Sequence, residues 1–330
     1  MSFIFAHRLK FAAAITLALA AIALAWAPTR RGPLKEISLC TPGFQSSALV
    51  LLAAEKSYFD QEGLKVNLQF RDTGRDCLAL LLGGKVDFAV SFETPVVHAT
   101  LQGHRLAVLT ELHRSEENTA IIFRKDRRIR TGRDLIGKRI GVLPNTTGEF
   151  LVELFLRSHM IDQSRVKIRS FTQDELVTAL KKGQVDAAGL WEPLITNLRT
   201  ESPAIFGKFG FSFYTEFSTV VGVRSRLEEQ PELGRALLKA LALSHWEYRR
   251  DTKGSQALVD EFLKEKGYAV YPENWDRVHV HLGLSATLLT MLNEEANWYQ
   301  SRNKGERLDL SVLLEGRLLR EIAPTLVTYQ

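Results

Sequence analysis

The chain has 330 residues, 45% of them hydrophobic and 25% charged, with a formal net charge of +5. This composition is typical of a globular protein long enough for two lobes, and it excludes a disordered or low-complexity chain. The charge is a weak bias and no basic run is interleaved with aromatic residues, so the sequence predicts no nucleic-acid partner.

The N-terminus carries an apolar run over residues 11–27, preceded by Arg8 and Lys10. This pattern predicts an export signal, with a cleavage site at Ala23-Leu24-Ala25, and therefore a periplasmic protein. The run is longer than a usual signal core of about 7 to 15 residues and shorter than the roughly 20 that span a bilayer. A retained inner-membrane anchor or a buried helix stays open, and we assign residues 1–33 to a signal peptide or anchor plus a linker.

A first α/β lobe is predicted over residues 34–115. Apolar alternation marks its strands, and an apolar run that ends at Gly marks a helix. The expected elements are strand 37–40, helix 46–58, strand 64–70, helix 75–83, strand 86–90, helix 94–103 and strand 105–112. The polar segment 114–118 lacks periodicity, and we interpret it as the first crossover between lobes.

A second lobe is expected over residues 116–216, beginning with strand 119–123. Strand patterns at 140–142 and 166–168 each precede a helix. Three helix starts have the spacing of a capping box. These pairs are Thr131 with Asp134, Thr146 with Glu149, and Thr172 with Glu175.

Residues 80–89 and 179–188 have nearly the same sequence. In both, an apolar helix end runs into Gly, one further residue, and then Val-Asp at a strand start. A helix stopped by Gly and followed at once by a strand is the joint of an α/β unit. The repeat therefore predicts two α/β lobes built alike, although two βαβ segments can also resemble each other by chance.

Residues 217–330 are predicted to return to the first lobe. The apolar strand 217–223 makes the return, and the helices that follow pack on that lobe. These helices are expected at 231–250, 254–266, 273–299 and 310–321. Two crossings between lobes make a hinge, because a few connecting residues absorb the backbone rotation while the lobes move as rigid bodies.

Ligands bind α/β sheets outside the carboxyl ends of the strands, and two such edges face to face form a cleft. Our candidate ligand-binding residues are Thr41, Gln45, Ser46, Thr73, Gly74, Ser91, Glu93, Thr94, Asn145, Thr146, Thr147, Gly148, Trp191 and Glu192. Most are neutral donors and acceptors suited to a small polar solute. Free amides at the start of the helix from Glu149 favour an anionic group, whereas Glu93 and Glu192 favour a cationic or amide-bearing one.

Several candidates also have a structural interpretation. Thr146 and Ser47 fit helix caps, Trp191 fits a core aromatic, and Glu93 and Glu192 fit paired surface or interlobe carboxylates. A paired-carboxylate enzyme would need the two glutamates to meet across the cleft.

The sequence contains no Gly-x-Ser-x-Gly elbow, Gly-x-Gly-x-x-Gly, P-loop or His-Glu-x-x-His motif. It therefore predicts neither an enzyme nor a cofactor. His279 and His281 lie two apart in a predicted helix, where their side chains diverge, so we expect no metal site.

Cys40 and Cys77 are the two cysteines, and in an exported chain they allow one disulfide. Cys40 ends the first predicted strand and Cys77 opens the helix after the neighbouring strand, so the two ends lie side by side in a parallel sheet. Two unpaired buried thiols are the alternative.

Several short segments occur in a fixed order along the chain. They are Ala53-Ala54-Glu55-Lys56-Ser57-Tyr58-Phe59-Asp60-Gln61-Glu62-Gly63-Leu64-Lys65-Val66, Gly84-Lys85-Val86-Asp87, Asp134-Leu135-Ile136-Gly137-Lys138-Arg139-Ile140-Gly141-Val142, Gly183-Gln184-Val185-Asp186-Ala187, Trp191-Glu192-Pro193 and Pro231-Glu232. In this order they resemble the substrate-binding proteins of ABC importers for aliphatic sulfonates, nitrate and thiamine-pyrimidine precursors. Ser57 departs from the pattern, since these proteins usually have Gly before the Tyr-Phe pair.

The resemblance implies a type II periplasmic-binding fold, in which two Rossmann-like lobes close on a small solute. It implies a monomeric extracytoplasmic receptor that delivers a sulfonate, nitrate, or a pyrimidine or aromatic compound to the permease of an ABC importer. The alternatives are a membrane-anchored ligand sensor or partner-binding module, and an enzyme on the same fold.

Overall fold

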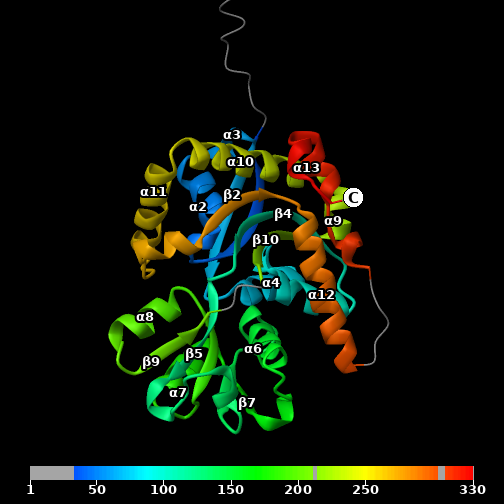
Figure 1. Cartoon of the computed structure of the whole chain (residues 1–330). Helices are drawn as coiled ribbons and strands as arrows, with labels where there is room; N and C mark the ends of the chain where they lie inside the picture. The colour runs from blue at the N-terminus through cyan, green and yellow to red at the C-terminus, as the bar shows by residue number, and fades with distance from the viewer. Residues whose placement is uncertain (1–32, 211–213, 304–308, 330) are drawn as a thin grey trace, which may run out of the picture. The chain divides into compact units, whose positions relative to one another are not determined.

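The computed structural model describes residues 33–210, 214–303 and 309–329, and residues 35–330 form one compact unit. The predicted export segment at residues 11–27 lies outside the described residues. Within the compact unit, two sheets flanked by helices form two lobes, with lobe one above lobe two in Figure 1.

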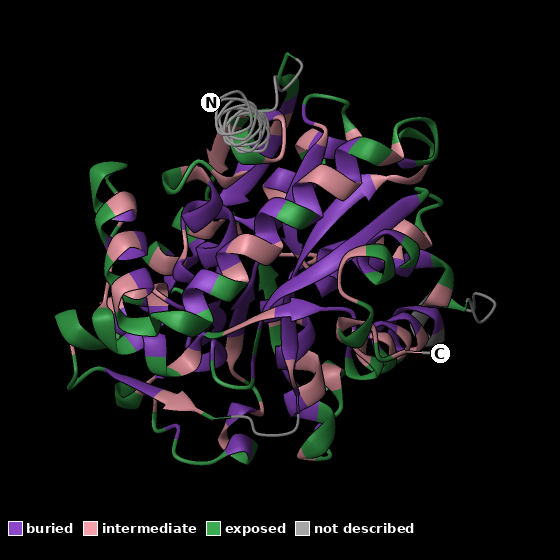
Figure 2. Cartoon of the chain, turned by 90° about the horizontal axis from the view of Figure 1, so that it is seen from above, coloured by how far each residue is buried: buried purple, intermediate pink, exposed green. Residues whose placement is uncertain are grey.

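Lobe one is built on a six-stranded sheet in the order β11-β4-β10-β3-β1-β2. Its strands are β1 (Lys35–Pro42), β2 (Leu64–Arg71), β3 (Phe88–Phe92), β4 (Leu106–Ser115), β10 (Glu216–Val223) and β11 (His279–Gly283). β1 pairs in parallel with β2 and β3, whereas β10 is antiparallel to β3 and β4. Buried residues follow these strands, and exposed ones gather on the outer faces of the helices (Figure 2).

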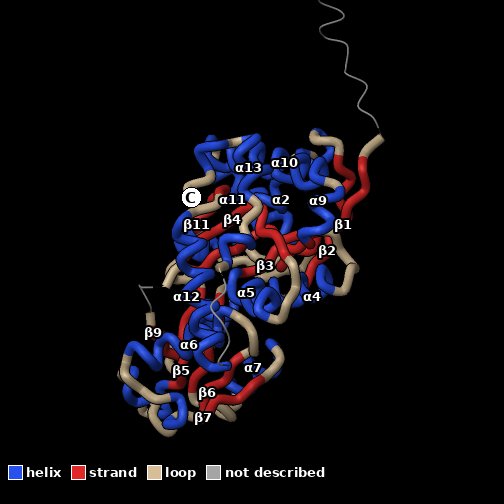
Figure 3. The backbone as a smooth tube through the Cα atoms, turned by 90° about the vertical axis from the view of Figure 1, so that its right-hand side faces the viewer, coloured by secondary structure: helices blue, strands red, loops and turns tan. Residues whose placement is uncertain are grey.

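Helices flank this sheet (Figure 3). They are α2 (Ala48–Glu55), α3 (Tyr58–Gln61), α4 (Gly74–Leu82), α5 (Glu93–Leu101), α9 (Arg224–Glu229), α10 (Pro231–Arg250), α11 (Thr252–Glu265), α12 (Ala286–Asn303) and α13 (Gly316–Ile322), with short turns η1 (Gln45–Ser47), η5 (Pro272–Arg277), η6 (Leu310–Leu313) and η7 (Pro324–Leu326). α2 is apolar on every side and buried over residues 48–53, because α10 and α11 pack against it. α12 packs against α5, and α13 against α10, so the C-terminal helices complete the core of lobe one.

Lobe two has a five-stranded sheet in the order β7-β6-β8-β5-β9. Its elements are β5 (Thr119–Arg124), η2 (Lys125–Arg127), η3 (Gly132–Leu135), β6 (Arg139–Val142), α6 (Thr147–Ser158), η4 (Gln163–Arg165), β7 (Lys167–Ser170), α7 (Gln173–Lys181), β8 (Ala187–Trp191), α8 (Leu194–Glu201) and β9 (Phe206–Phe209). β6 is parallel to β7 and β8, whereas β5 is antiparallel to β8. β5 therefore holds in this sheet the place that β10 holds in the other, and each begins where the chain has just crossed between lobes.

The repeated Gly-x-Val-Asp segments have the same structural role in both lobes. Their glycines, at the ends of α4 and α7, have positive φ. Asp87 accepts a hydrogen bond from the backbone N–H of Ser38 at 2.7 Å, and Asp186 accepts one from that of Arg139 at 2.9 Å. Each aspartate thus joins the start of the third parallel strand of its lobe to the start of the first.

The helix predicted at 273–299 is wrong. The structure instead has η5, the edge strand β11, and α12 from Ala286. Valine alternates with histidine over residues 278–281, a period of two that fits a strand, and β11 pairs with β4. His279 and His281 therefore face the same way, which removes our reason for excluding a metal there; across the described ranges, no three His, Cys, Asp or Glu are grouped to hold a metal ion. The helix expected at 310–321 is also interrupted, being divided into η6 and α13.

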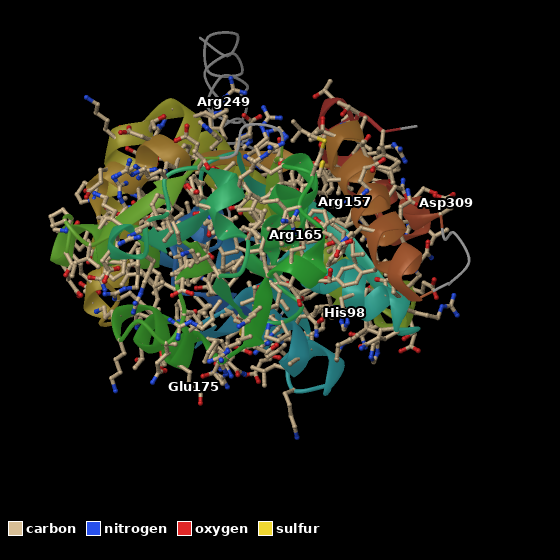
Figure 4. All side chains as sticks on the ribbon, turned by 60° about the horizontal axis from the view of Figure 1, so that its bottom comes forward. His98, Arg157, Arg165, Glu175, Arg249 and Asp309 are labelled. Atoms are coloured by element: carbon tan, nitrogen blue, oxygen red, sulfur yellow. A yellow bond between two sulfur atoms is a disulfide. The ribbon has the colours of Figure 1, made fainter. Side chains whose placement is uncertain are left out.

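Two of the predicted capping boxes form, and a third does not. The two that form are Thr131 with Asp134, and Thr172 with Glu175, the latter at the exposed rim of the molecule (Figure 4). At the start of α6, the Thr146 hydroxyl instead donates to the Leu143 carbonyl at 2.7 Å. Glu149 accepts from the backbone N–H of Asn145 at 2.8 Å, because the left-handed backbone of Asn145 turns that group toward it. α6 thus begins without a side-chain cap.

Candidate functional site

A pocket of about 380 Å³, including the space at its mouth, lies between the two lobes at the carboxyl ends of the parallel strands. Lobe one contributes the loop before η1 and the residues after β2 and β3 to the pocket wall. Lobe two contributes the start of α6 and the end of β8. The first crossing between the lobes contributes the remaining residues. The described lining residues are Phe44, Thr73, Gly74, Arg75, Phe92, Pro95, Asn118, Thr119, Thr146, Thr147 and Trp191. This is the edge where α/β proteins bind ligands.

Part of the predicted ligand-binding set meets here. The predicted residues that line the pocket are Thr73, Gly74, Thr146, Thr147 and Trp191. A neighbouring pocket of about 290 Å³ is lined by three others, Gln45, Ser46 and Glu192. The two pockets share Phe44 and Asn118, so they adjoin at the base of the cleft.

Thr41, Ser91 and Thr94 are fully buried and do not line either pocket. Thr41 donates to the Ser47 hydroxyl at 2.8 Å, and Ser47 donates to a backbone carbonyl of the same loop. Ser47 therefore does not cap α2 with its side chain, contrary to the interpretation from the sequence. Thr94 Oγ1 lies 3.5 Å from Thr147 Oγ1, which joins α5 of lobe one to α6 of lobe two.

Gly148 has a packing role at the start of α6. A Cβ atom there would lie 2.8 Å from the carbonyl oxygen of Gly189, so no larger residue allows α6 to begin against β8. This close approach positions Thr146 and Thr147 in the pocket wall. Asn145, with φ of 58°, makes the turn just before them.

Several lining residues were missed from the sequence: Phe44, Arg75, Phe92, Pro95, Asn118 and Thr119. The three apolar ones were missed because only polar side chains were considered. Arg75 directly follows a predicted site residue, Gly74, and that adjacency was the available signal. Asn118 ends the predicted crossover and Thr119 begins the strand predicted after it, and this segment forms the base of the cleft.

Arg75 is the one charged residue among the described residues that line the pocket. Its Nη1 donates to the Pro144 carbonyl at 3.0 Å, so the side chain reaches from α4 of lobe one to lobe two. Its Nη2 lies 3.4 Å from Asp76 Oδ1, and the side chain stays 33% exposed. A partly exposed guanidinium beside apolar walls can bind a carboxylate, sulfonate or phosphate group.

The lobes also touch at the opposite rim, where η5 meets α8. Thr196 Oγ1 donates to Asn274 Oδ1 at 3.1 Å, and the Tyr271 hydroxyl donates to Asn197 Oδ1 at 3.2 Å. These bonds, with Arg75 on the other side, bridge the cleft from lobe to lobe.

Glu192 and Glu93 have different partners. Glu192 accepts from the backbone N–H of Thr196 at 2.9 Å, and its other oxygen lies 3.7 Å from Arg277 of lobe one. Glu192 is thus an interlobe carboxylate, one of the alternatives that the sequence left open. Glu93 is fully buried and accepts from the Tyr214 hydroxyl, so the two glutamates do not form a pair in this structure.

Cys40 and Cys77 are joined by a disulfide. The bond links the end of β1 to the first turn of α4, directly behind the loop that carries Thr73 and Arg75. It thereby ties the pocket wall of lobe one to the sheet.

The fold agrees with solved binding proteins. The periplasmic aliphatic sulphonate binding protein SsuA from Escherichia coli superimposes with a TM-score of 0.71 at 16% identity, covering 87% of this chain and 99% of that one. The alkanesulfonate-binding protein SsuA from Xanthomonas axonopodis pv. citri bound to MOPS gives 0.68 at 17% identity, covering 86% and 99%. The predicted two-lobed periplasmic-binding fold is therefore confirmed.

A curated relative is the taurine-binding periplasmic protein of Escherichia coli, 23% identical over 167 residues, or 50% of this chain and 52% of that protein. The chain spans about half the length of the curated relatives it matches. Residues 45–249 match the family described as NMT1/THI5 like, which confirms the resemblance found in the sequence. That match covers more than half of the chain, which belongs to the NMT1/THI5-like family.

Proposed function

We propose that this protein is an extracytoplasmic solute-binding protein that captures a small organic anion between its lobes and delivers it to an ABC importer. The observation that carries the proposal is the single guanidinium of Arg75 in an otherwise uncharged pocket shared by both lobes. Relatives of this chain that are named as binding proteins support the same function.

Two further features favour an anion. α6, a helix of 12 residues, begins at the pocket without a side-chain cap, so its first backbone N–H groups and the helix dipole favour negative charge. No carboxylate is among the described lining residues, so an ammonium group on the ligand would have no counter-charge there. The pocket thus favours a simple anion over a zwitterion.

The rest of the wall fits an apolar body. Phe44, Phe92, Pro95 and Trp191 provide flat or compact apolar surfaces, and the hydroxyls of Thr73 and Thr119 provide neutral polar contacts. The space enclosed between the lobes is small, so the ligand must be small or the lobes must separate slightly to admit it. A short alkyl or single-ring sulfonate or carboxylate has the size and polarity that such a wall accepts.

Binding is proposed to close the cleft by rotation of one lobe against the other. The rotation takes place at the two crossings, which join residues 34–115 to 116–216 and residues 116–216 to 217–330. The contacts of Arg75 with lobe two, and of η5 with α8, exist only when the lobes meet. A ligand that touches both lobes therefore favours the closed state by its differential affinity.

The location and partner belong to the same proposal: export to the periplasm, a monomer, and an importer permease as the receiving partner. The taurine-binding relative is named as periplasmic. No helix in the described part of the chain is long and apolar enough to cross a membrane.

Thermal-shift assays and calorimetry with a panel of solutes test the proposal. Hexane-1-sulfonate, benzenesulfonate and benzoate should raise the melting temperature by mass action, whereas benzylamine and benzyl alcohol should not, and taurine should bind more weakly than hexane-1-sulfonate. Arg75→Gln should abolish the shifts. Arg71→Gln, an exposed arginine at the end of β2 that does not line the pocket, is the matched control and should retain them. Equal binding of the amine, or no shift with any solute, would refute the proposal.

Binding is proposed to occur without chemical turnover. Ligand recovered after prolonged incubation should be unchanged by mass spectrometry, and a new product would instead support an enzyme on this fold. Delivery is tested by uptake of labelled ligand into cells that express the chain or lack it, and equal uptake would refute the transport role.

A further inference from the structure

Directly behind the ligand pocket lies a buried group of acids, Glu93 of α5, Glu216 of β10 and Glu295 of α12, together with Tyr214 of the second crossing. We call these four residues the acid cluster. All three carboxyl side chains are buried, with at most 1% of each residue exposed. The Tyr214 hydroxyl contacts Glu93 Oε1 and lies 3.1 Å from Glu295 Oε1. The backbone N–H of Phe217 donates to the second oxygen of Glu93 at 2.8 Å.

Hydrogen bonding within the acid cluster requires a proton on at least one carboxyl. A phenol has one hydrogen, so the Tyr214 hydroxyl can donate to Glu93 or to Glu295 but not to both. The contact between the Tyr214 oxygen and the other glutamate is favourable only if that glutamate is protonated and donates to the Tyr214 oxygen. The geometry thus holds a proton among these side chains.

In the described part of the chain, no positive charge pairs with the carboxyls of the acid cluster. Among the described ion pairs, none joins a Lys or Arg to Glu93, Glu216 or Glu295. Among the described residues, the basic side chain that faces the acid cluster is His113 of β4, whose Nε2 lies 3.8 Å from Glu216 Oε1. Burial, and to a smaller extent the nearby His279, lowers the pKa of His113 to about 3, so it is neutral and offers no counter-charge.

The other described side chains found against the acid cluster are neutral. β5 and the first crossing offer Thr119 and Asn118, and α6 offers the ring of Phe150. Phe150 packs edge-on against Tyr214 and against Trp298 of α12, at 5.4 and 5.0 Å between ring centroids. A residue of lobe two therefore closes the acid cluster, and opening of the lobes would admit water to it.

Two threonines connect the acid cluster to the pocket. Thr119 lines the pocket, and its hydroxyl donates to Glu216 Oε2. Thr94 is hydrogen-bonded to Glu295 and lies 3.5 Å from Thr147 Oγ1, which lines the pocket from lobe two. A negative charge on the cluster therefore lies one side chain away from a bound anion.

We propose that capture of the anion is coupled to protonation of the acid cluster, so that the closed, liganded protein holds a proton which the open protein releases. This rests on the proposed function, because it concerns how the same pocket is regulated. An anion in the pocket is repelled by an ionised Glu216 or Glu93 and not by a protonated one. When Glu216 is protonated, the Thr119 hydroxyl is also free to donate to the ligand.

The electrostatics give the direction of the effect. Burial, and next the charge of Glu216, raises the pKa of Glu93 to about 8, while burial raises the pKa of Glu216 to about 7. Burial also raises the pKa of Glu295 well above its usual value. The cluster thus loses protons as the pH rises through neutrality, and affinity for an anion should fall over the same range.

Titration calorimetry with hexane-1-sulfonate tests this coupling, because a sulfonate does not itself titrate in this range. We expect affinity about tenfold weaker near pH 9 than near pH 6, which corresponds to a ligand-induced pKa shift of about one unit in one carboxyl. Near pH 7.5, buffers of different ionisation enthalpy should show that the protein takes up a fraction of a proton per ligand. This measurement needs no variant.

Glu216→Gln, which resembles the protonated acid, should keep the affinity high near pH 9 and remove the proton uptake. Its matched control is Glu111→Gln, another buried acid, bonded to the backbone N–H of Ser285 in lobe one and absent from the pocket wall. That control should keep the wild-type pH profile. If Glu216→Gln does not fold, Tyr214→Phe should alter the pH at which affinity falls.

The outcomes separate the two proposals. Equal affinity near pH 6 and pH 9 with no proton uptake would refute the coupling alone and leave the solute-binding function standing. Failure to bind near pH 6, where the cluster is protonated, would refute both. Infrared spectra of the liganded protein should show a protonated carboxyl band near pH 6.5 that is weaker in Glu216→Gln, and the absence of that band would also refute the coupling.

Discussion

Glu93 and Glu192 occupy the same place in the two lobes, and their surroundings differ completely. Each directly follows the third parallel strand of its sheet, six residues after the aspartate of the repeated Gly-x-Val-Asp segment. Both glutamates are buried, but Glu93 lies among other acids, whereas Glu192 is ion-paired with Arg277 across the cleft. The repeated Gly-x-Val-Asp segment therefore predicts the position of a residue at the edge of the cleft, but it does not predict the chemical role of that residue.

The difference comes from what covers the two positions. In lobe one the second crossing brings Tyr214 over Glu93, and α12 adds Glu295 from the C-terminal region. In lobe two the corresponding carboxylate contacts the helix that it precedes and Arg277 of η5, and the charge of Lys208 in β9 also acts on it. A buried carboxyl among other acids favours its protonated form, whereas a buried carboxyl beside basic side chains has partners for a charged contact.

The largest effect that would test this contrast is on folding stability. Glu93→Ala removes the acceptor of the Tyr214 hydroxyl and of the Phe217 N–H, leaving buried donors unpaired at a cost of about 4 kcal/mol in the free energy of unfolding. Glu192→Ala removes one helix-start acceptor and the buried partner of one interlobe ion pair, at a smaller cost of about 2 kcal/mol. Urea denaturation of both variants measures the difference between their losses in the free energy of unfolding. Equal losses would show that the two sites are alike.

The next effect is the dependence of stability on pH. Glu93 and Glu216 have folded-state pKa values of about 8 and about 7, raised by burial above the ordinary glutamate value of 4.5. Between about pH 4.5 and pH 8 the folded protein therefore binds more protons than the unfolded chain. Their contribution to stability is fully present below about pH 4.5 and is lost as the pH rises toward 8.

Histidines oppose this trend at lower pH. Burial lowers the pKa of His113 to about 3 and that of His281 to about 4, so both favour the unfolded chain as the pH falls below 6.5. The carboxyl effect is therefore cleanest from about pH 6.5 to 8, where we expect a loss on the order of 2 kcal/mol. Thermal unfolding across this range should show it in the wild type and in Glu192→Gln, and a flatter slope in Glu93→Gln. A wild-type slope retained by Glu93→Gln would contradict the assignment.

The sequence was sufficient to predict the lobes and their order, because Gly-x-Val-Asp, the strand alternation and the helix starts are local signals. It also placed Thr73, Thr146 and Trp191 at the cleft edge, since the end of a parallel strand implies that position. It could not predict the acid cluster, because Glu93, Glu216 and Glu295 are brought together only by the second crossing and α12. Strand β11 was missed because its alternating residues are flanked by helix-like sequence.

A smaller effect concerns closure at the rim. Arg277→Gln removes the ion pair with Glu192, which joins the lobes only when the cleft is closed. We expect affinity for hexane-1-sulfonate to fall about fivefold, equivalent to about 1 kcal/mol, with little change in the free energy of unfolding. Arg317→Gln, which removes an exposed pair with Glu321 within lobe one, is the matched control and should leave affinity unchanged. Unaltered affinity in Arg277→Gln would mean that the rim contact plays no part in closure.

The smallest effect is expected from one hydroxyl at the same rim. Tyr271→Phe removes only the hydrogen bond to Asn197 of α8, at a part-buried site where such a bond contributes about 0.5 kcal/mol. Affinity should fall about twofold in calorimetry, and the pH at which affinity falls should not move, because the acid cluster is untouched. Tyr329→Phe, whose hydroxyl bonds the backbone N–H of Gly316 far from the cleft, controls for loss of a phenol. A shifted pH profile in Tyr271→Phe would mean that the rim and the cluster are one coupled unit, and the contrast between Glu192 and Glu93 would then be one of position only.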